Sequence, residues 1–494
     1  MKAALLSSAN TIIAGGIVID GSGTPGNILD VVVRDGVIAD IVPAGSATGA
    51  ERVDATGLTL APGFIDAHTH DDLVVIEAPE MTPKISQGVT TVVVGNCGIS
   101  AGAGLMAPGQ SPPDPLALLG PADQFRYRRF ADWADAVEAA QPSVNVAALV
   151  GHTALRVAQL DRLDRPAAKA EVAAMCEQLR DAMAAGALGL STGLAYRNAA
   201  AAPTDEVLAL AEVLRESGGV YATHLRDETA GILGALDEAF AIGRRAEQPV
   251  VVSHLKCAGA SNYGRSHEVL ASLERAADGQ PVGCDCYPYT ASSSTLDLKQ
   301  VVPETPILIT WSESEPEQAG RMLADIAVDW RTDIVSAARR LQPAGAVYHC
   351  MADADVERIL AHPLTMIGSD GLPVDPLPHP RLWGAFPRVL GHYVRERQLF
   401  PLETAVRKMT GLAADRFGLT GRGYIRKGYA ADLVLFDAAQ IADRATFSDP
   451  TRPAAGLRGV WVNGVRTLSE DGTVRARAGR MLRRNSNQQQ GIPG

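Results

Sequence analysis

The sequence predicts an α/β protein built on a (β/α)8 barrel of the TIM type, with a small β-sandwich-like domain and an insertion over the barrel mouth. Three observations lead to this fold class. Eight buried-type strand segments alternate with amphipathic helices through the middle of the chain, short alternating strands occur near both ends, and 494 residues are enough for both units.

The small domain is expected to combine residues 1–61 with residues 416–480. The first part alternates as short antiparallel strands do, with turn signals at "DGSGTPG" and "RDGVIAD". The same alternation of apolar and polar residues occurs in "KGYAADLVLFD" and "VWVNGVRTL", where Asn463 and Gly464 form a strong hairpin signal. We therefore expect the two ends of the chain to pair into one β domain.

The barrel is expected to span residues 62–415. Its eight strand candidates are, in order, "GFIDAHTH", "VTTVVVGNC", "VNVAALVGH", "GALGLST", "GVYATHL", "PVVVSHLK", "PVGCDCYPY" and "LTMIGSD". Between them, "AAKAEVAAMCEQLRDAMAA" and "DEVLALAEVLRESG" have helical periodicity and end at glycines. Eight such units predict a closed barrel.

Two segments fall outside this repeat. Residues from about 290 to 345 are too long for a βα loop and carry strand and helix signals of their own, so we expect an inserted subdomain over the barrel mouth. Residues 481–494 are mostly polar, and we expect a disordered tail.

Composition excludes several classes of partner. The formal net charge of −11 and the absence of a long basic run argue against nucleic acid or an anionic membrane as the main partner. The six cysteines show neither a disulfide framework nor a CxxC zinc knuckle, which fits a reducing compartment. The apolar stretch near the start is broken by Ser, Asn and Gly, unlike a signal peptide. We expect a cytoplasmic enzyme that acts on a small molecule.

Polar residues gather where the predicted strands end, which is where barrel enzymes carry their chemistry. Alone, each has an ordinary explanation: Cys97 as a small buried hydrophobe, a His-x-His pair as chance or core packing, and an Asp as a turn former. Together they converge on one rim and indicate a metal site. The set is His68, His70, Cys97, His224, His254 and Asp370.

These residues lie within motifs that resemble the amidohydrolase superfamily, and closely its N-acyl-D-amino-acid deacylases (D-aminoacylases). The resemblance covers nearly the whole chain. It rests on "GGIVIDGSG", "APGFIDAHTHDD", "GNCG", "GALGLSTGLAY", "ATHLRDE", "SHLK", "YPYTASS", "IGSDGLP" and "GYIRKGYAADLVLFD". Many superfamily relatives bridge two metals with a carboxylated lysine on the fourth strand, but "GALGLSTGL" contains no lysine. In the deacylases a cysteine on the second strand takes the ligand role, which the resemblance assigns to Cys97.

The resemblance implies two metal positions of unequal affinity. Cys97, His224 and His254 form the tight one, and His68, His70 and Asp370 a weaker one for a second divalent ion. A thiolate with two imidazoles favours zinc and leaves a fourth position open, as a catalytic site requires. The sequence leaves open whether the second ion is present or needed.

The resemblance also implies how an amide would be hydrolysed. Zinc lowers the pKa of water to about 7 and polarises a carbonyl. Asp370 would take the proton from water and return it to the leaving nitrogen. Tyr196 of "STGLAY" would donate to the developing oxyanion, although a packing role for this tyrosine stays open.

Three further residues predict a substrate with a free α-carboxylate. Lys256 lies two residues past His254, so strand alternation points both into one pocket, where a buried lysine needs an anion. Arg381 and Tyr287 match the family's carboxylate-binding positions, with a solvated loop arginine as the alternative for Arg381. We expect His152 and His349 to form local hydrogen bonds rather than to bind metal.

Two other functions stay open. The first is a metal enzyme for a cyclic amide or a β-aspartyl dipeptide, against which the missing strand-four lysine and the presence of Cys97 count. The second is a non-catalytic scaffold of the same fold, against which the full ligand set counts. Lys299 is compatible with an acidic substrate side chain or with simple solvation, and the sequence predicts neither acyl-group preference nor oligomeric state.

Overall fold

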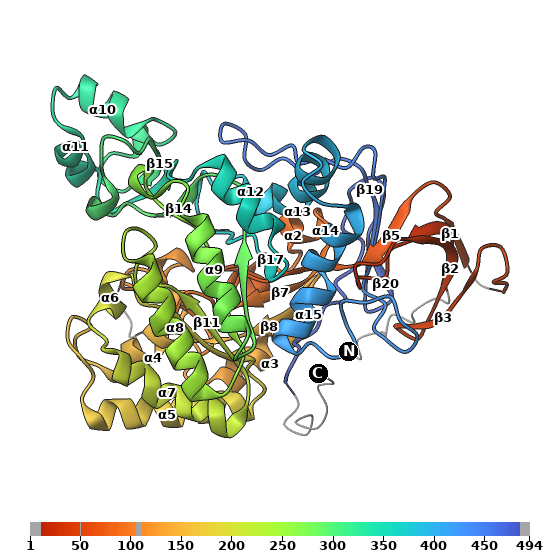
Figure 1. Cartoon of the computed structure of the whole chain (residues 1–494), viewed down its shortest axis with the longest axis horizontal. Helices are drawn as coiled ribbons and strands as arrows, with labels where there is room; N and C mark the ends of the chain where they lie inside the picture. Colours follow the sequence, from red (N-terminus) through yellow and green to blue (C-terminus); the bar gives the residue numbers. More distant parts are fainter. Residues whose placement is uncertain (1–10, 50, 105, 107–110, 485–494) are drawn as a thin grey trace.

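A computed structural model describes residues 11–49, 51–104, 106 and 111–484. Strands from both ends of this range form one mostly antiparallel sheet, at the right of Figure 1. Its order is β20-β19-β18-β5-β1-β2-β3, with β4 beside β1. The strands are β1 (Thr11–Val18), β2 (Asn27–Arg34), β3 (Val37–Pro43), β4 (Glu51–Asp54), β5 (Thr59–Pro62), β18 (Leu433–Phe436), β19 (Leu457–Val462) and β20 (Val465–Leu468).

The two ends of the chain meet where β5 pairs antiparallel with β18, for example at Leu60 and Leu435. Asn463 and Gly464, which connect β19 to β20, both have left-handed backbone angles (φ 49° and 78°), as a two-residue hairpin of this kind requires. This turn prediction is confirmed.

Parallel strands form the second unit, and each pairs with the next along the chain. β8 and β9 are one strand interrupted at Leu149. The last strand returns to the first, because Ala67 N donates to Ile367 O at 3.2 Å. The strands are β6 (Phe64–Asp66), β7 (Val89–Val94), β8 (Asn145–Ala148), β9 (Val150–Gly151), β10 (Gly189–Gly193), β11 (Val220–His224), β12 (Val250–Val252), β13 (Val282–Cys286) and β17 (Thr365–Ile367). The predicted α/β class with parallel strands is confirmed.

Helices cover the outside of these strands (Figure 1). They include α3 (Phe130–Ala140), α4 (His152–Gln159), α5 (Lys169–Ala184), α7 (Thr204–Ser217), α8 (Ile232–Ala246), α9 (Ser266–Ala277), α12 (Asp353–Ala361), α14 (Leu402–Met409) and α15 (Gly411–Phe417). Further helical elements lie in the loops: α1 (Val74–Glu77), α2 (Thr82–Ile85), α6 (Arg197–Ala200) and α13 (Arg381–Arg388). In the described part of the chain, none of the helices has the length and apolar character needed to cross a membrane.

The segment expected to be an insertion carries its own three-stranded antiparallel sheet, at the upper left of Figure 1. β16 (Ala344–Tyr348) lies between β14 (Ser292–Thr295) and β15 (Ile307–Ser312). Two helices, α10 (Leu323–Asp329) and α11 (Ile334–Leu341), complete it.

The first residues of the segment expected to be a disordered tail, 481–484, are ordered in the structure. Met481 pairs with Val146 of β8, and Leu482 N donates to Val146 O at 2.7 Å. Residues 481–484 are therefore held against the parallel strands, because their backbone completes hydrogen bonds there. Residues 485–494 lie outside the described residues.

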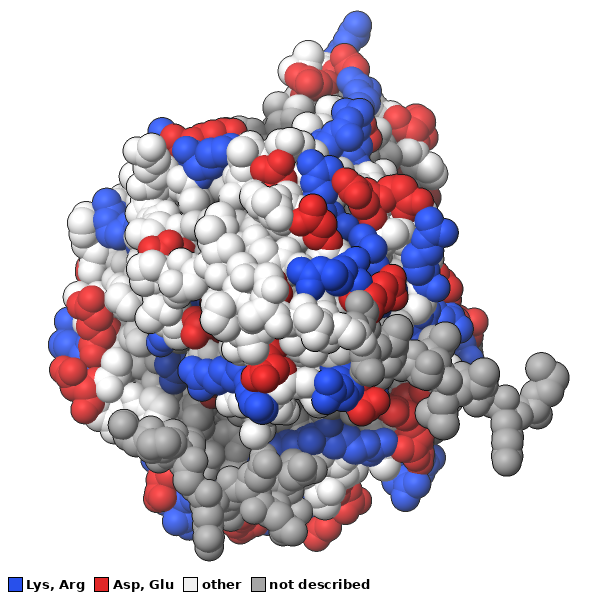
Figure 2. All heavy atoms as spheres, turned by 90° about the vertical axis from the view of Figure 1, so that its right-hand side faces the viewer, with Lys and Arg blue, Asp and Glu red and all other residues white. Residues whose placement is uncertain are grey.

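Figure 2 faces the side of the molecule that carries the mostly antiparallel sheet. Uncharged residues occupy the middle of this face, and acidic and basic residues are mixed around them. The strands here expose some apolar side chains, of which Ile28 on β2 is the most exposed at 64%.

Candidate functional site

The His-x-His pair follows β6 and is buried in the centre of the parallel strands. The ring centroids of His68 and His70 are 5.4 Å apart. His68 Nδ1 lies 3.2 Å from an oxygen of Asp285 on β13. Burial alone would lower the pKa of His68, but the anionic groups of Asp285 and Cys97 raise it well above its usual value. Both imidazoles therefore face anions rather than an apolar core.

Cys97 lies in a tight turn that follows β7. Its Sγ is 3.2 Å from His68 Nε2 and 3.3 Å from His254 Nε2. Burial opposes ionisation of the thiol, but His68 and His254 hold its pKa well below the usual range. Gly95 makes the turn possible, since a Cβ there would lie 2.1 Å from the backbone oxygen of Leu149. The turn therefore presents a thiolate to two imidazoles, unlike an inert core cysteine.

His224 ends β11 and His254 follows β12, with their ring centroids 4.5 Å apart. Glu228 lies beside both rings, since its carboxylate is 3.1 Å from His254 Nδ1 and 3.5 Å from His224 Nε2. Burial raises the pKa of this carboxyl, but His224, Lys256 and His254 together hold it well below its usual range. Glu228 is therefore an anion that fixes the orientation of the two imidazoles.

Asp370 lies just past β17, in a left-handed backbone conformation (φ 48°). One carboxylate oxygen is 3.2 Å from His70 Nε2 and 3.5 Å from His68 Nε2. The other forms an ion pair with Arg381 Nη2 at 2.9 Å. Burial opposes ionisation, but Arg381 and the histidines hold the pKa of Asp370 well below its usual value. A strained backbone at a buried, ionised carboxyl is typical of a functional position.

The donor atoms of these residues fit a metal ion. One nitrogen, sulfur or oxygen from each of His68, Cys97, His254 and Asp370 lies within 4.8 Å of the others, and His224, Glu228 and His254 form a second such group. Within the described part of the chain, His70 Nδ1 and His224 Nδ1 are buried without a hydrogen-bond partner. Cys97 lies close to both His68 and His254. These distances alone therefore do not separate the residues into a tight and a weak metal position.

A group of buried polar atoms without partners lies next to Asp370, in the described residues around Arg381. The guanidinium carbon of Arg381 is 4.5 Å from the ring centroid of Tyr287, and its Nη2 donates to Ser293 O at 3.3 Å. The unpartnered atoms are Arg381 Nε and Nη1, Tyr287 OH, Ser293 Oγ and His379 Nε2. Buried polar groups are rarely left unsatisfied, so this arrangement suits an anionic ligand.

Lys256 differs from the sequence-based expectation. It is buried beside His254, but both residues lie beyond β12, which ends at Val252, so strand alternation does not place them there. Its Nζ already has an anionic partner, Glu228, at 2.6 Å. It also lies 2.8 Å from His254 Nδ1. The expectation that this lysine requires an arriving anion was therefore wrong, because Glu228 supplies one from within the chain.

Tyr196 precedes α6 and its ring centroid lies 4.7 Å from that of His224. Burial and the anionic Cys97 and Asp370 raise the pKa of its hydroxyl well above the usual value. The hydroxyl therefore stays protonated and can donate a hydrogen bond near the histidines. His152, in contrast, forms the expected local hydrogen bond, to Glu206 at 2.9 Å, whereas the ring of His349 packs on Phe447.

Sequence reasoning missed the residues that support this set. Asp285 could have been found, because a carboxylate between Cys284 and Cys286 in a buried strand requires a partner. Glu228, four residues after His224 in "HLRDE", gave a weaker signal. Ser293 and His379 belong to segments whose proximity depends on the tertiary fold, and no local pattern indicates it.

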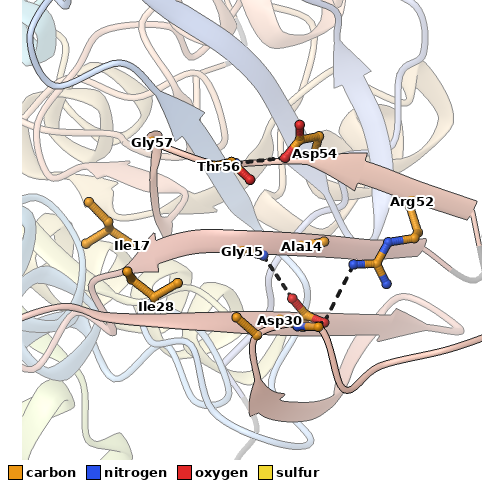
Figure 3. A pocket seen from close by; sticks show the side chains of 11 residues that line it. Ala14, Gly15, Ile17, Ile28, Asp30, Arg52, Asp54, Thr56 and Gly57 are labelled. Carbon is orange, nitrogen blue, oxygen red and sulfur yellow. Dashed lines mark hydrogen bonds and ion pairs between the residues drawn. The ribbon is translucent and has the colours of Figure 1, made fainter.

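A separate hollow of about 680 Å³ lies in the mostly antiparallel sheet (Figure 3). It is lined by residues of β1, β2, β4 and their loops, far from the strand ends that carry the histidines. Its buried carboxylate, Asp30, already accepts hydrogen bonds from Gly15 N at 2.9 Å, Gly45 N at 3.0 Å and Ala47 N at 3.3 Å. We assign the chemistry to the histidine and cysteine cluster.

Known proteins are similar to this chain over nearly its whole length. The model of the amidohydrolase family matches residues 51–468. A D-aminoacylase of Alcaligenes xylosoxydans xylosoxydans is 50% identical over 475 residues, which are 96% of this chain and 98% of that protein. An N-acyl-D-aspartate deacylase of the same organism is 50% identical over 479 residues, 96% of this chain and 95% of that protein.

Solved structures show the same similarity. A D-aminoacylase crystal structure, 50% identical, superposes with a TM-score of 0.94 over 96% of this chain and all of that one. The N-acyl-D-glutamate deacylase of Bordetella bronchiseptica, in complex with zinc and a phosphonate mimic of the tetrahedral intermediate, is 45% identical, with a TM-score of 0.91 over 96% of this chain and 99% of that one. The parallel strands thus form a TIM-barrel type fold, and the chain belongs to the amidohydrolase family, in its group of N-acyl-D-amino-acid deacylases.

Proposed function

We propose that this chain hydrolyses the amide bond of N-acyl-D-amino acids in a zinc-dependent reaction that releases a carboxylate and a free D-amino acid. One observation carries the proposal: a buried thiolate and imidazole cluster lies beside unpartnered donors around Arg381. The first suits a metal, and the second suits the α-carboxylate of the substrate. The relatives named for this activity are 50% identical over nearly the whole chain.

The proposed zinc ligands are Cys97, His224 and His254, with a weaker second position at His68, His70 and Asp370. A thiolate with two imidazoles suits zinc. When bound, zinc would acidify water and polarise an amide carbonyl. Glu228 and Asp285 support the set, because each contacts a ring nitrogen of a proposed ligand and so fixes its orientation.

Asp370 is the proposed proton carrier. It is ionised, it lies within 3.5 Å of both histidines that follow β6, and it faces the group around Arg381. It would accept a proton from the attacking water and deliver it to the leaving nitrogen, which an amide requires because its amine is a poor leaving group. The Tyr196 hydroxyl would donate to the oxyanion that develops on the carbonyl.

Arg381 and Tyr287 are the proposed carboxylate receptor. Arg381 uses Nη2 for Asp370 and Ser293 and keeps Nε and Nη1 free, so either of these nitrogens can donate a hydrogen bond to a carboxylate. Because the carboxylate is held here and the carbonyl near the ligand cluster, only one enantiomer would direct its side chain into the remaining space. The relatives' substrates favour the D-enantiomer.

The domain division and the cellular setting are also proposals. Residues 1–61 and 416–480 would form the small β domain, and the segment at about 290–345 would cover the barrel mouth. The contact of Arg381 with Ser293 of β14 supports the second point. A cytoplasmic location fits six free thiols, because a reducing compartment preserves them.

A panel of substrates tests the proposed function. N-acetyl-D- and N-acetyl-L-methionine, the N-acetyl forms of D-aspartate and D-glutamate, a β-aspartyl dipeptide and a cyclic amide would be assayed with metal analysis. We expect release of D-amino acids by zinc-containing protein. Preference for the β-aspartyl dipeptide or the cyclic amide would favour the alternative amidohydrolase reaction, and an inactive, metal-free chain would favour a scaffold.

A further inference from the structure

Lys84 is the centre of a buried polar network beneath the proposed ligands. It belongs to the one-turn helix α2, and its side chain is completely buried. Its three ammonium protons have three short acceptors: Asp66 Oδ2 at 2.9 Å, Thr69 Oγ1 at 2.8 Å and Ser369 Oγ at 2.8 Å. Asp71 lies slightly farther away, at 3.3 Å.

The network joins two segments that are 300 residues apart in the sequence. Thr69 Oγ1 accepts a hydrogen bond from Lys84 and donates one to Asp71 at 2.8 Å. Ser369 Oγ accepts a hydrogen bond from Lys84 and donates one to Asp66 at 2.6 Å. Each hydroxyl therefore bridges the ammonium and a buried carboxylate. Thr69 does so within the segment that follows β6, and Ser369 links the segment after β17 to Asp66.

The backbone of the proposed ligands is tied into the same network. Asp66 Oδ1 accepts from Ser369 N at 2.8 Å and from His68 N at 3.3 Å. Asp370 N donates to His68 O at 2.7 Å, and its left-handed backbone would not persist without such support. The network therefore fixes the place of His68 and Asp370 relative to each other.

We propose that Lys84 is a positioning residue that sets the relative placement of the His68–His70 segment and Asp370, and through them the geometry of the metal site. It does not reach the substrate. The proposal rests on the proposed function for the identity of the ligands. Burial alone would lower the pKa of Lys84, but Asp66 and Asp71 raise it, so the ammonium is charged in the folded chain. The packing is close, since a Cβ on Gly371 would lie 3.0 Å from Lys84 Nζ.

Lys84→Met tests the proposal, because methionine keeps most of the length and removes the three donors. Lys408→Met is the matched control: Lys408 is also buried, but it donates to the backbone oxygens of His362 and Thr365 near the start of β17, at the opposite end from Asp370. Both variants would be loaded with Co²⁺, whose visible absorption reports ligand geometry, and with zinc for kinetics. Circular dichroism would check the fold.

We expect Lys84→Met to change the Co²⁺ absorption bands and to lower kcat or metal affinity by roughly 10–100-fold, with KM little changed. Lys408→Met should keep the wild-type bands and kcat. Wild-type bands and kcat in Lys84→Met would overturn the proposal, as would equal changes in both variants.

If Lys84→Met does not fold, Thr69→Val and Ser369→Ala replace it, since each removes one bridging hydroxyl and leaves the ammonium. They should change the bands in the same way, and unchanged bands in both would overturn the proposal. A wild-type chain that gives Co²⁺ bands but no deacylation would refute the proposed function only. The comparison of bands would still decide the role of Lys84, whereas a wild type without any Co²⁺ bands would overturn both.

Discussion

Replacing Arg381 by methionine should weaken recognition of the substrate carboxylate by a predictable amount. Arg381 is 1% exposed, and Nε and Nη1 are its unpartnered nitrogens within the described structure. One hydrogen bond to a charged carboxylate contributes about 1.5–3 kcal/mol, a factor of roughly 10–10² in kcat/KM. The variant also removes the partner of Asp370, so the loss of activity alone would not isolate substrate binding.

A thermodynamic cycle with two substrates separates these effects. Acetate release would be measured for N-acetyl-D-methionine and for its methyl ester, which lacks the carboxylate charge. The variant should lose roughly 10–10²-fold more activity on the acid than on the ester, because only the acid presents a charged acceptor to the free nitrogens. Arg388→Met is the control, since Arg388 lies on the same helix but pairs with Asp443. Equal losses on acid and ester would refute the carboxylate receptor.

Other substitutions test separate parts of the account. Cys97→Ala should lower bound zinc and abolish turnover while the fold persists, as measured by metal analysis and circular dichroism; full zinc with a normal rate would return Cys97 to a packing role. Asp370→Asn should lower kcat at least ~10²-fold with KM little changed and the tight zinc retained, whereas wild-type kcat would exclude it as proton carrier. Glu206 has a pKa of about 2, below its ordinary 4.5, because His152 and Arg156 outweigh the effect of burial. A carboxyl whose pKa is lowered by folding stabilises the fold above about pH 4.5, and this contribution is lost as the pH falls through about 2. Glu206→Gln should therefore lower the free energy of unfolding by up to about 3 kcal/mol at pH 7 and have little effect near pH 2. An equal difference at both pH values in denaturant titrations would contradict this sign.

The barrel strands and the first contacts of the site were predictable from the sequence because both follow from local patterns. Buried runs such as "TTVVV" define strands, and parallel strands bring their carboxyl ends to one rim. His68, Cys97, His254 and Asp370 could therefore be grouped from the order of the strands alone. The hairpin at Asn463 was predictable for the same reason, since its two residues suit one turn type.

Other features depend on contacts that no local pattern contains. The pairing of Lys256 with Glu228 joins two loops, so sequence alone could not show that the lysine has a partner within the chain. Met481 lies in a polar segment, and its place beside Val146 depends on a strand more than 300 residues earlier. No local sequence pattern singles out Lys84, because its acceptors come from segments on either side of the barrel closure.

The most direct test of the central claim is zinc-dependent deacetylation with a choice of enantiomer. Protein stripped of metal by a chelator would be titrated with zinc, and acetate release would be followed from N-acetyl-D-methionine and N-acetyl-L-methionine in parallel. We predict no activity without metal, recovery of activity on the D-enantiomer as the tight position fills, and little on the L-enantiomer. Full activity in the stripped protein, or equal rates on the two enantiomers, would contradict the account.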